Sequence, residues 1–327
     1  MFVPWSENKY FVCSTYALKI WVARMELRHL RYFIAVAEEG SLTNAAARRL
    51  HTAQPSLSRQ IRDLELEIGV KLLERMARRI ALTAAGRAFL DQARLALLQV
   101  EAAAEAARRA EQPQKPVFAV GFLAGQEVVL LPDALRILRE EAPDVEFALS
   151  SQSSPELALA LMRGKVDVAF LRRETQTTGL AFKFLIKEPL IAVLPTGHRL
   201  AARKAIRPQE IARETFISLA APVLKSAIDD YAAKVGITLK AKHDADNLSG
   251  AMSLVASIGG VTLFPLYAQN MLTRAVVARP LRGEPPTIDL LIGYNKSNTS
   301  PLLKRFLSRA DELVVGVSQK QRFLPVG

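Results

Sequence analysis

The stretch MELRHLRYFIAVAEEGSLTNAAARRLHTAQPSLSRQIRDLELEIGVKLLERMARRIALTAAG, residues 25–86, decides the fold of the first part of the chain. Apolar residues recur in it at intervals of three and four, which predicts short helices with one buried face each. The buried face of the first helix is predicted to comprise Leu27, Leu30, Ile34 and Ala37. Gly40 is predicted to end this helix, because glycine readily adopts the backbone conformation that follows a helix.

Two further helices follow Gly40 in the same stretch. The second is short and is predicted to begin at a cap formed by Ser41 or Thr43. Its inner face is predicted to carry Ala46, Ala47 and Leu50. After the turn of residues 51–53, Pro55 suits the first turn of a third helix, where its missing N–H costs nothing. The third helix is predicted to bury Leu57, Ile61, Leu64 and Ile68. This arrangement is a helix-turn-helix in outline.

The exposed face of the third helix and the segment after it are polar and basic. The face carries Gln54, Ser58, Arg59 and Arg62. Residues 70–82 show little alternation of apolar and polar residues and contain Arg75, Arg78 and Arg79. This pattern favours a two-stranded wing that lies beside a nucleic-acid groove over an element of the core. On an isolated helix such a face is more often merely solvated. The surrounding helix-turn-helix pattern favours nucleic-acid binding instead.

A long helix is predicted over residues 84–111, because Thr83 can cap it and no proline interrupts it. Its apolar residues repeat at intervals of three and four, as in a heptad seam. The seam is predicted to comprise Leu90, Ala93, Leu97, Val100 and Ala104. Packing against the chain's own domain is the alternative, but a narrow stripe on so long a helix favours pairing with a second chain. Residues 112–116 contain two prolines and are predicted to form a hinge.

Beyond the hinge, residues 117–317 alternate between predicted strands and helices, which indicates βαβ units around a parallel sheet. Strands are predicted at residues 117–123, 145–151, 166–171, 190–194, 215–218, 237–243, 261–264 and 288–294. They form two similar sets, so two α/β lobes are expected. The last strand and a helix over residues 301–315 are expected to return to the first lobe. Residues 318–327 are assigned to a tail.

Length and composition restrict the class of protein. A chain of 327 residues is longer than one hydrophobic core usually organises, so at least two domains are expected. The formal net charge of +12 indicates a polyanionic partner but does not distinguish between DNA, RNA and a membrane. The single cysteine, Cys13, excludes an internal disulfide, which fits a reducing cytoplasm. The apolar residues 10–23 are broken by Lys19 and are too short to span a bilayer. Residues 1–24 are interpreted as an extension upstream of the natural start, because regular patterning begins at Met25.

Residues 25–86 resemble the DNA-binding domain of the LysR-type transcription regulators of bacteria. The rest of the chain is similar to the family's effector domain in its order of elements and in the strings GFLAGQEVVLLP, MRGKVDVAFLR, LIAVLPTGHRLA and SIGGVTLFP. The resemblance implies a winged helix-turn-helix over residues 25–83, the linker helix, and a two-lobed α/β effector domain of the periplasmic-binding-protein type. It also implies operator DNA, RNA polymerase and a small-molecule effector as partners, assembly into homodimers or homotetramers, and transcriptional activation.

The strings MELRHLRYF, LHTAQPSLS and VTLFP are most similar to the regulators of phenylpropionate and cinnamate catabolism within this family. An aromatic or other carboxylic acid is therefore the expected effector. From Met25 to Leu50 the sequence is one residue longer than the usual family spacing, around residues 44–45. A longer turn is expected to absorb the additional residue.

The resemblance places the third helix in the major groove of DNA. The residues that match the family's contacts are Gln54, Pro55, Ser58 and Arg59, with Arg78 matching the wing residue that reaches the minor groove. Glutamine pairs with adenine and arginine with guanine, so this helix face suits direct readout of the bases. Arg75 and Arg79 are then expected near phosphates, where they contribute affinity rather than specificity.

The resemblance also places an effector between the two lobes. The residues expected to contact it are Gly125, Ser153, Ser154, Arg172, Ser218, Pro222, Val223, Asn247, Leu248 and Phe264. Gly125 replaces a serine common in relatives, which puts part of the family's carboxylate-binding pattern in doubt. Ser153 and Ser154 precede a helix start that favours an anion, although capping alone explains Ser154 equally well. Arg172 offers a positive charge or pairs with a nearby acid.

Catalysis is the rival interpretation, since a two-lobed α/β region with a cleft also occurs in enzymes and solute-binding proteins. The sequence contains no GxSxG elbow, Walker loop or HExxH motif, and its four histidines are scattered. We therefore expect no catalytic residues, no metal ligands and no cofactor. The alternative function is a cytoplasmic small-molecule-binding protein or enzyme with an accessory DNA-binding head.

Overall fold

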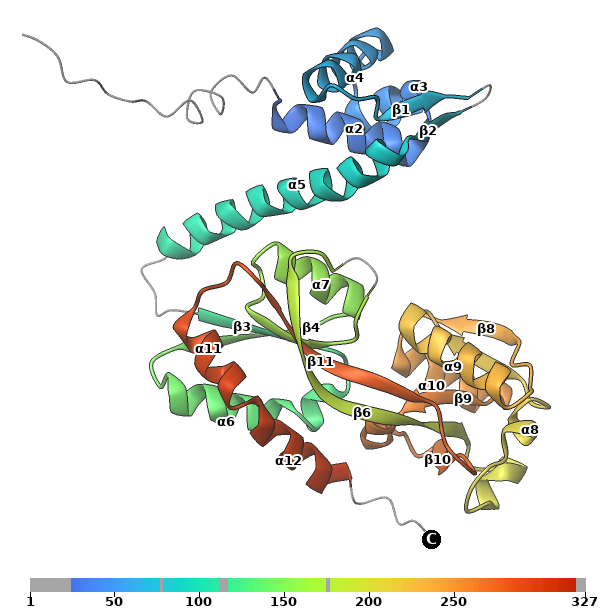
Figure 1. The fold of residues 1–327 in the computed structure, drawn as a ribbon. Helices are drawn as coiled ribbons and strands as arrows, with labels where there is room; N and C mark the ends of the chain where they lie inside the picture. Colours follow the sequence, from blue (N-terminus) through green and yellow to red (C-terminus); the bar gives the residue numbers. More distant parts are fainter. Residues whose placement is uncertain (1–24, 77–78, 112–116, 175–176, 322–327) are drawn as a thin grey trace, which may run out of the picture. The chain divides into compact units, whose positions relative to one another are not determined.

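The computed structural model describes residues 25–76, 79–111, 117–174 and 177–321 (Figure 1). The predicted extension (residues 1–24), the predicted hinge (residues 112–116) and Arg78 lie outside these ranges. The chain divides into two compact units, Met1–Val100 and Glu101–Gly327, and each is considered by itself below.

The first unit has the predicted order of three helices and a two-stranded wing. Its elements are α2 (Leu27–Glu39), α3 (Leu42–Asn44), the π-helix Ala45–Leu50, α4 (Gln54–Ile68), β1 (Leu73–Arg75), β2 (Ile80–Leu82) and the first part of α5 (Ala84–Glu111). Strands β1 and β2 pair antiparallel. Gly40 follows α2 with a φ of 60°, as expected for a glycine that ends a helix. These features confirm the predicted winged helix-turn-helix.

The core of the first unit centres on Phe33, whose ring meets that of Phe89 edge to face with centroids 5.1 Å apart. The predicted inner face of α2 was partly wrong. Leu30 is buried, but Leu27 is exposed and Ile34 is only half-buried. Two stripes of α2 have helical spacing, and the stripe that contains the large Phe33 side chain is the one that is buried, because it removes more apolar surface from water.

The segment in which the sequence analysis places an additional residue forms a π-helix rather than a longer turn. Within Ala45–Leu50 each backbone hydrogen bond spans five residues instead of the four of an α-helix. The N–H of His51, for example, donates to the carbonyl of Ala46. A π-helical segment holds an additional residue within a helix, so the connection to α4 keeps its length. The wider turn also changes which residues face inward: Ala45 and Ala46 are buried and Ala47 is exposed, so the prediction for Ala47 was wrong.

The second unit contains two lobes and two clusters of buried apolar residues. The larger cluster joins first-lobe residues such as Ile137 to second-lobe residues such as Leu248 and Phe264. The first lobe begins with β3 (Val117–Phe122), α6 (Leu131–Glu141), β4 (Glu146–Ser151), α7 (Ser154–Met162) and β5 (Val168–Leu171). The remaining elements are β6 (Leu180–Pro195), α8 (Pro208–Ile211), β7 (Phe216–Leu219), α9 (Pro222–Lys234), β8 (Ala241–Ala245), α10 (Leu248–Ile258), β9 (Thr262–Pro265), β10 (Val276–Pro280), β11 (Thr287–Asn295), α11 (Pro301–Ser308) and α12 (Ala310–Gln321). Short 3-10 helices cover Gln126–Val128, Arg199–Ala202 and Leu266–Met271.

The prediction of a parallel sheet was right only in part. Strand β3 pairs parallel with β4 and β5, and β7 pairs parallel with β8. In contrast, β6 pairs antiparallel with β9, β10 and β11. Strands β6 and β11 run side by side from one lobe to the other (Figure 1). Strand β6 spans 16 residues, and only its continuously buried stretch, residues 190–194, resembled a strand in the sequence.

The end of the described chain returns to the first lobe, as predicted, but as two helices. Both α11 and α12 pack against α6. The break falls at Arg309, whose guanidinium donates to Glu140, Glu141 and Glu312. Helix α12 also continues through residues 318–321, which the sequence analysis had assigned to a tail.

Candidate DNA-binding and effector-binding sites

Helix α4 presents the residues predicted to read DNA on one exposed face. Gln54, Pro55, Arg59 and Arg62 are exposed and Ser58 is half-buried. The helix is held from behind by Leu57, Ile61 and Leu64, which are buried in the core of the first unit. The structure therefore brings the predicted face together on a fixed helix. Its contact with DNA stays a prediction.

The guanidinium groups on this face are available to a ligand. The Arg59 side chain is 81 % exposed, and its Nε lies 3.9 Å from Asp63 Oδ2, a surface pair of little energetic weight. Arg62 forms no ion pair with a described residue. Arg79 is exposed beside β2, and Arg75 lies in β1. The structure thus keeps the basic wing and the helix face within one domain.

A buried histidine supports α4 from α2, which the sequence analysis did not anticipate. His29 Nδ1 accepts the N–H of Glu26 at 3.0 Å, and Nε2 lies 2.7 Å from Gln60 Oε1. Because Nδ1 is an acceptor here, Nε2 carries the proton and donates to Gln60. The spacing of apolar residues gives no signal for such a contact. Helix α4 is therefore held in place by a polar contact with His29 as well as by its own buried apolar residues.

Glu65 joins α4 to the start of the wing. Its Oε1 accepts the N–H groups of Leu72 and Leu73 at 2.9 and 3.0 Å, and Lys71 Nζ donates to Oε2 at 2.7 Å. Burial by itself raises the pKa of Glu65, but the hydrogen bonds from Lys71 and the two backbone N–H groups outweigh it, so the pKa lies below its ordinary value. The ionised carboxylate therefore stabilises this connection.

We expect the Glu65→Gln variant to lose about 1–3 kcal/mol of stability at neutral pH, because a neutral amide no longer pairs with Lys71 and accepts these bonds less strongly. A carboxyl with a lowered folded pKa contributes fully above its unfolded pKa, near 4.3, and loses the contribution as pH falls through the folded value. Urea unfolding between pH 3 and 7 should therefore show a flatter acid limb for Glu65→Gln. An acid limb identical to that of the wild type would contradict this role.

The predicted pairing seam on α5 is divided between two environments. Leu90 and Ala93 are buried in the core of the first unit, so these two residues do not form part of an exposed seam. They face inward because the first turns of α5 complete the winged-helix core. Leu97 is half-buried, whereas Val100 and Ala104 are exposed. Only the later part of the stripe is open to a second chain.

A cavity of about 370 Å³ lies in the second unit, at the end of β4, the start of α7 and the start of α9. Of the residues predicted to contact an effector, it is lined by Ser153, Ser154, Arg172, Pro222, Val223, Asn247 and Leu248. These residues come from both lobes. Their role as ligand contacts stays a prediction.

Three of the predicted residues do not line this cavity. Gly125 has a φ of 93°, and a Cβ there would lie 2.2 Å from Met271 Sδ, so it is required for close packing. Ser218 is buried, and its hydroxyl donates to the carbonyl of Leu219. Phe264 is completely buried in the core, and the next residue, Pro265, lines the cavity instead.

The two serines at the start of α7 have different roles. The N-cap is Ser153, whose N–H and hydroxyl both donate to Glu156 Oε2 at 2.9 and 2.7 Å. The prediction that Ser154 caps the helix was therefore wrong. Ser154 Oγ accepts the backbone N–H of Arg172 at 2.9 Å and so holds the end of β5 to α7.

Arg172 is the most unusual group at the cavity. It is buried and forms an ion pair with Glu188, which is completely buried on β6. Gln126 Nε2 lies 3.4 and 3.3 Å from the two carboxylate oxygens of Glu188. Arg172 Nη1, however, has no hydrogen-bond partner among the described residues. A buried guanidinium nitrogen without a partner is costly unless a ligand or water accepts its hydrogen bonds.

Two further titratable residues that the sequence analysis missed line this cavity. Burial raises the pKa of the Tyr267 hydroxyl, partly offset by Arg172, so the phenol stays protonated. Burial likewise raises the pKa of Glu174, which favours its protonated form. The Tyr267 hydroxyl can therefore donate a hydrogen bond near neutral pH. The lining also contains apolar residues, among them Leu123, Val223, Leu248 and Ile288.

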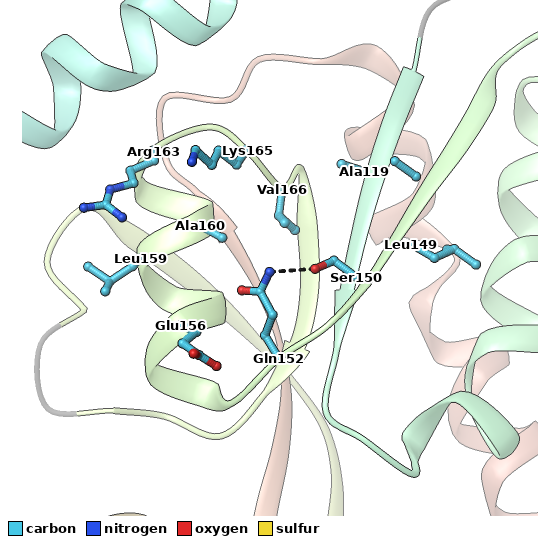
Figure 2. A pocket seen from close by; sticks show the side chains of 11 residues that line it. Ala119, Leu149, Ser150, Gln152, Glu156, Leu159, Ala160, Arg163, Lys165 and Val166 are labelled. Carbon is cyan, nitrogen blue, oxygen red and sulfur yellow. Dashed lines mark hydrogen bonds between the residues drawn. The ribbon is translucent and has the colours of Figure 1, made fainter.

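A second cavity, of about 560 Å³, lies in the first lobe beside the segment that joins β4 to α7 (Figure 2). Figure 2 shows Gln152 at its centre, donating to Ser150 Oγ at 2.6 Å. Arg163, at its edge, pairs with Glu101. This cavity shares Gln152 and Glu156 with the first but contains none of the residues predicted to contact an effector.

The described ranges contain no cluster of three or more histidine, cysteine, aspartate or glutamate side chains arranged to hold a metal ion. Within the same ranges, no helix is both long enough and apolar enough to cross a bilayer.

Comparison with known proteins decides the family. Residues 27–87 match the bacterial regulatory helix-turn-helix proteins of the lysR family, and residues 111–314 match the LysR substrate binding domain. The second match alone covers more than half of the chain. The chain belongs to the LysR family. It is therefore a DNA-binding transcription regulator with a domain for a small-molecule effector.

The LysR-family relatives cover nearly the whole chain. The Hca operon transcriptional activator HcaR of Escherichia coli is 38 % identical over 90 % of this chain and 100 % of its own length. The regulator AlsR of Bacillus subtilis is 33 % identical over 86 % of this chain and 94 % of its own. The crystal structure of the LysR-family regulator CbnR aligns with a TM-score of 0.53, at 26 % identity over 88 % of this chain and 100 % of CbnR. CbnR has also been solved in complex with its target DNA.

Proposed function

We propose that this regulator responds to a small carboxylic acid, aromatic or otherwise, bound in the 370 Å³ cavity between the lobes of the second unit. The observation that carries the proposal is Arg172 Nη1, a buried donor without a partner among the described residues. A carboxylate oxygen would accept this hydrogen bond, and charge-assisted bonds of this kind are the strong ones.

The rest of the cavity fits such a ligand. Its volume lies at the lower end of the range of small-molecule sites, which suits a compact acid. The protonated Tyr267 phenol supplies a further donor, and the apolar residues of the lining suit a ring or alkyl chain. Three acidic side chains line the cavity, Glu156, Glu174 and Asp246, so a single carboxylate fits better than a multiply charged anion.

For the DNA-binding domain we propose base contacts from Gln54, Pro55, Ser58 and Arg59, and phosphate contacts from Arg62, Arg75 and Arg79. The exposure of Arg59 and Arg62 on a helix fixed by its core supports this assignment. We further propose that the exposed part of the α5 stripe, Leu97, Val100 and Ala104, pairs with a second copy and that pairs assemble into tetramers. Such a protein acts in the cytoplasm, where operator DNA lies.

The proposed mechanism is a population shift between two arrangements of the effector domain. A ligand that binds one arrangement more tightly than the other displaces the equilibrium toward it. Because the lobes are joined by β6 and β11, a ligand that touches both lobes changes the angle between them, and the DNA-binding domains are then repositioned on the operator. No step in this mechanism requires catalysis, and we propose that the chain is not an enzyme.

Replacing Arg172 with lysine tests the effector site. Lysine keeps a positive charge for Glu188 but lacks the second nitrogen, so we expect benzoate to bind about tenfold more weakly or worse, which corresponds to about 1.4 kcal/mol. The measurement is the rise in melting temperature with increasing benzoate, since a ligand of the folded state raises its stability. Lys225→Ala, on the exposed face of α9, is the matched control.

Two outcomes would reject the proposal. If Arg172→Lys responds to benzoate as the wild type does, Arg172 does not bind the carboxylate. If no member of a panel of aromatic and aliphatic carboxylic acids raises the melting temperature of the wild type, the effector is of another class.

A further inference from the structure

A separate cavity of about 340 Å³ lies in the second lobe and shares no residue with the effector cavity. It is formed by the start of α8, the end of α9 and the turn after β10. Its lining contains three basic side chains, Arg207, Lys234 and Arg282, and one acidic side chain, Glu284. The cavity therefore carries an excess of positive charge.

The backbone holds two of these basic residues next to each other. Ile206 and Leu281 form a parallel β-bridge, and the N–H of Arg282 donates to the carbonyl of Ile206 at 2.8 Å. Arg207 and Arg282 are the residues that follow this bridge on the two segments. Both are exposed, and neither forms an ion pair or side-chain hydrogen bond with a described residue. Two guanidinium groups carried on adjacent backbone segments at the lining of one cavity favour an anion there.

A buried hydroxyl provides the second, independent observation. Tyr231 on α9 lines the same cavity and is 6 % exposed, and its hydroxyl has no hydrogen-bond partner among the described residues. Burial raises the pKa of this phenol, so it is a donor near neutral pH. Most buried polar groups have a partner, and a ligand oxygen would supply one here.

Lys234 lies one helical turn beyond Tyr231 on α9. Its Nζ is 2.8 Å from Glu284 Oε2, and both side chains are largely exposed. Exposed pairs of this kind contribute little, so Lys234 can turn from Glu284 to an incoming anion at small cost. The guanidinium groups, the phenol and the ammonium group then form four donors around one cavity.

We propose that this cavity binds a small tetrahedral oxyanion, either inorganic phosphate or the phosphate group of a metabolite, as a second ligand of the regulator. Arginine recognises such anions through two parallel N–H bonds, which suits the paired Arg207 and Arg282. Phosphate has enough acceptor oxygens to bond Tyr231 as well. A carboxylate has only two oxygens and would leave some of these donors unused.

The test is the melting temperature of the full-length protein in the presence of inorganic phosphate, a simple phosphate monoester such as phenyl phosphate, and acetate. All salts alter stability in a general way, so the comparison is with the Arg207→Ala/Arg282→Ala variant under the same conditions. We expect phosphate and the monoester to raise the melting temperature of the wild type more than that of the double variant. Each guanidinium removed should weaken binding about tenfold, or about 1.4 kcal/mol.

Two further variants keep the test specific. Arg203→Ala removes an exposed arginine of the same lobe outside the cavity and should respond to phosphate as the wild type does. Tyr231→Phe should be no less stable than the wild type without phosphate, because it removes a hydroxyl that has no partner, and should respond less to phosphate. A response to the monoester but not to phosphate would identify a phosphorylated metabolite, and equal responses would identify the free ion as sufficient.

Three results would overturn the proposal. One is a phosphate response that is the same in the wild type and in the double variant. Another is an acetate response as large as the phosphate response and equally dependent on the two arginines, since that would exclude a tetrahedral anion as the preferred ligand. The third is a Tyr231→Phe variant that loses stability but keeps the full phosphate response. The response to benzoate should be unchanged in all these variants, which separates this site from the effector cavity.

Discussion

Replacing Glu188 with alanine is expected to lower the free energy of unfolding by about 3–5 kcal/mol, because it leaves the buried Arg172 guanidinium without its counter-ion. The alanine also removes the acceptor that faces Gln126. Urea unfolding followed by circular dichroism, at neutral pH and without added effector, measures the change. This is the largest single effect on stability that we expect in the effector domain.

The control for Glu188→Ala removes both charges together. In the Arg172→Met/Glu188→Leu variant no buried charge is left unpaired, and replacement of a buried pair by apolar residues is often neutral or stabilising. We therefore expect the double variant to regain most of the lost stability, although it no longer binds a carboxylate. An exposed ion pair contributes at most about 1 kcal/mol. If the free energy of unfolding of Glu188→Ala lies within that amount of the wild-type value, the two charges are not coupled in the way the structure indicates.

Replacing Arg59 with alanine should weaken binding to the operator by about 5–150-fold, the equivalent of 1–3 kcal/mol for one contact between an arginine and a guanine. Binding to DNA of unrelated sequence should fall far less, so specificity falls as well. Fluorescence anisotropy with labelled DNA from the upstream region of the regulator's own gene, and with a scrambled duplex, gives both affinities. Circular dichroism confirms that the exposed substitution leaves the fold unchanged.

Arg79→Ala is the matched control for Arg59→Ala, because Arg79 is also exposed but is assigned to the phosphates. It should weaken binding to both duplexes to a similar extent. It should also reduce the slope of the logarithm of the binding constant against the logarithm of the salt concentration by about 1. If Arg59→Ala behaved in the same way as Arg79→Ala, Arg59 would be a phosphate contact and the proposed base readout would be wrong.

The helices of the DNA-binding domain could largely be predicted, because each has a regular apolar spacing and a recognisable start or end. The Leu57, Ile61 and Leu64 face of α4 follows directly from this spacing. The choice between two stripes on α2 could not be made, since spacing alone does not reveal that Phe33 meets Phe89. The division of the α5 stripe was missed for the same reason: Leu90 and Val100 have equivalent spacing but different neighbours.

The effector cavity shows what sequence reasoning can and cannot supply. Arg172 and the start of α7 were predicted from family resemblance and lie at the cavity. Their partners could not be predicted, because Glu188 lies on β6 just before the part that resembled a strand, and Tyr267 follows a different strand in the second lobe. Contacts between residues distant in sequence depend on topology, and the antiparallel pairing of β6 and β11 was not evident from local patterns.

The π-helix Ala45–Leu50 has a consequence for comparing this regulator with its relatives. The additional residue changes the numbering of everything after it, while the widened turn absorbs it before α4 begins. An alignment counted from Met25 would therefore shift the predicted α4 contacts by one position and put the buried Leu57 in the place of Ser58. An alignment anchored on α4 avoids this error. Chain length before α4 and the exposed face of α4 can thus vary independently, because the π-helix takes up the change in length before α4 begins.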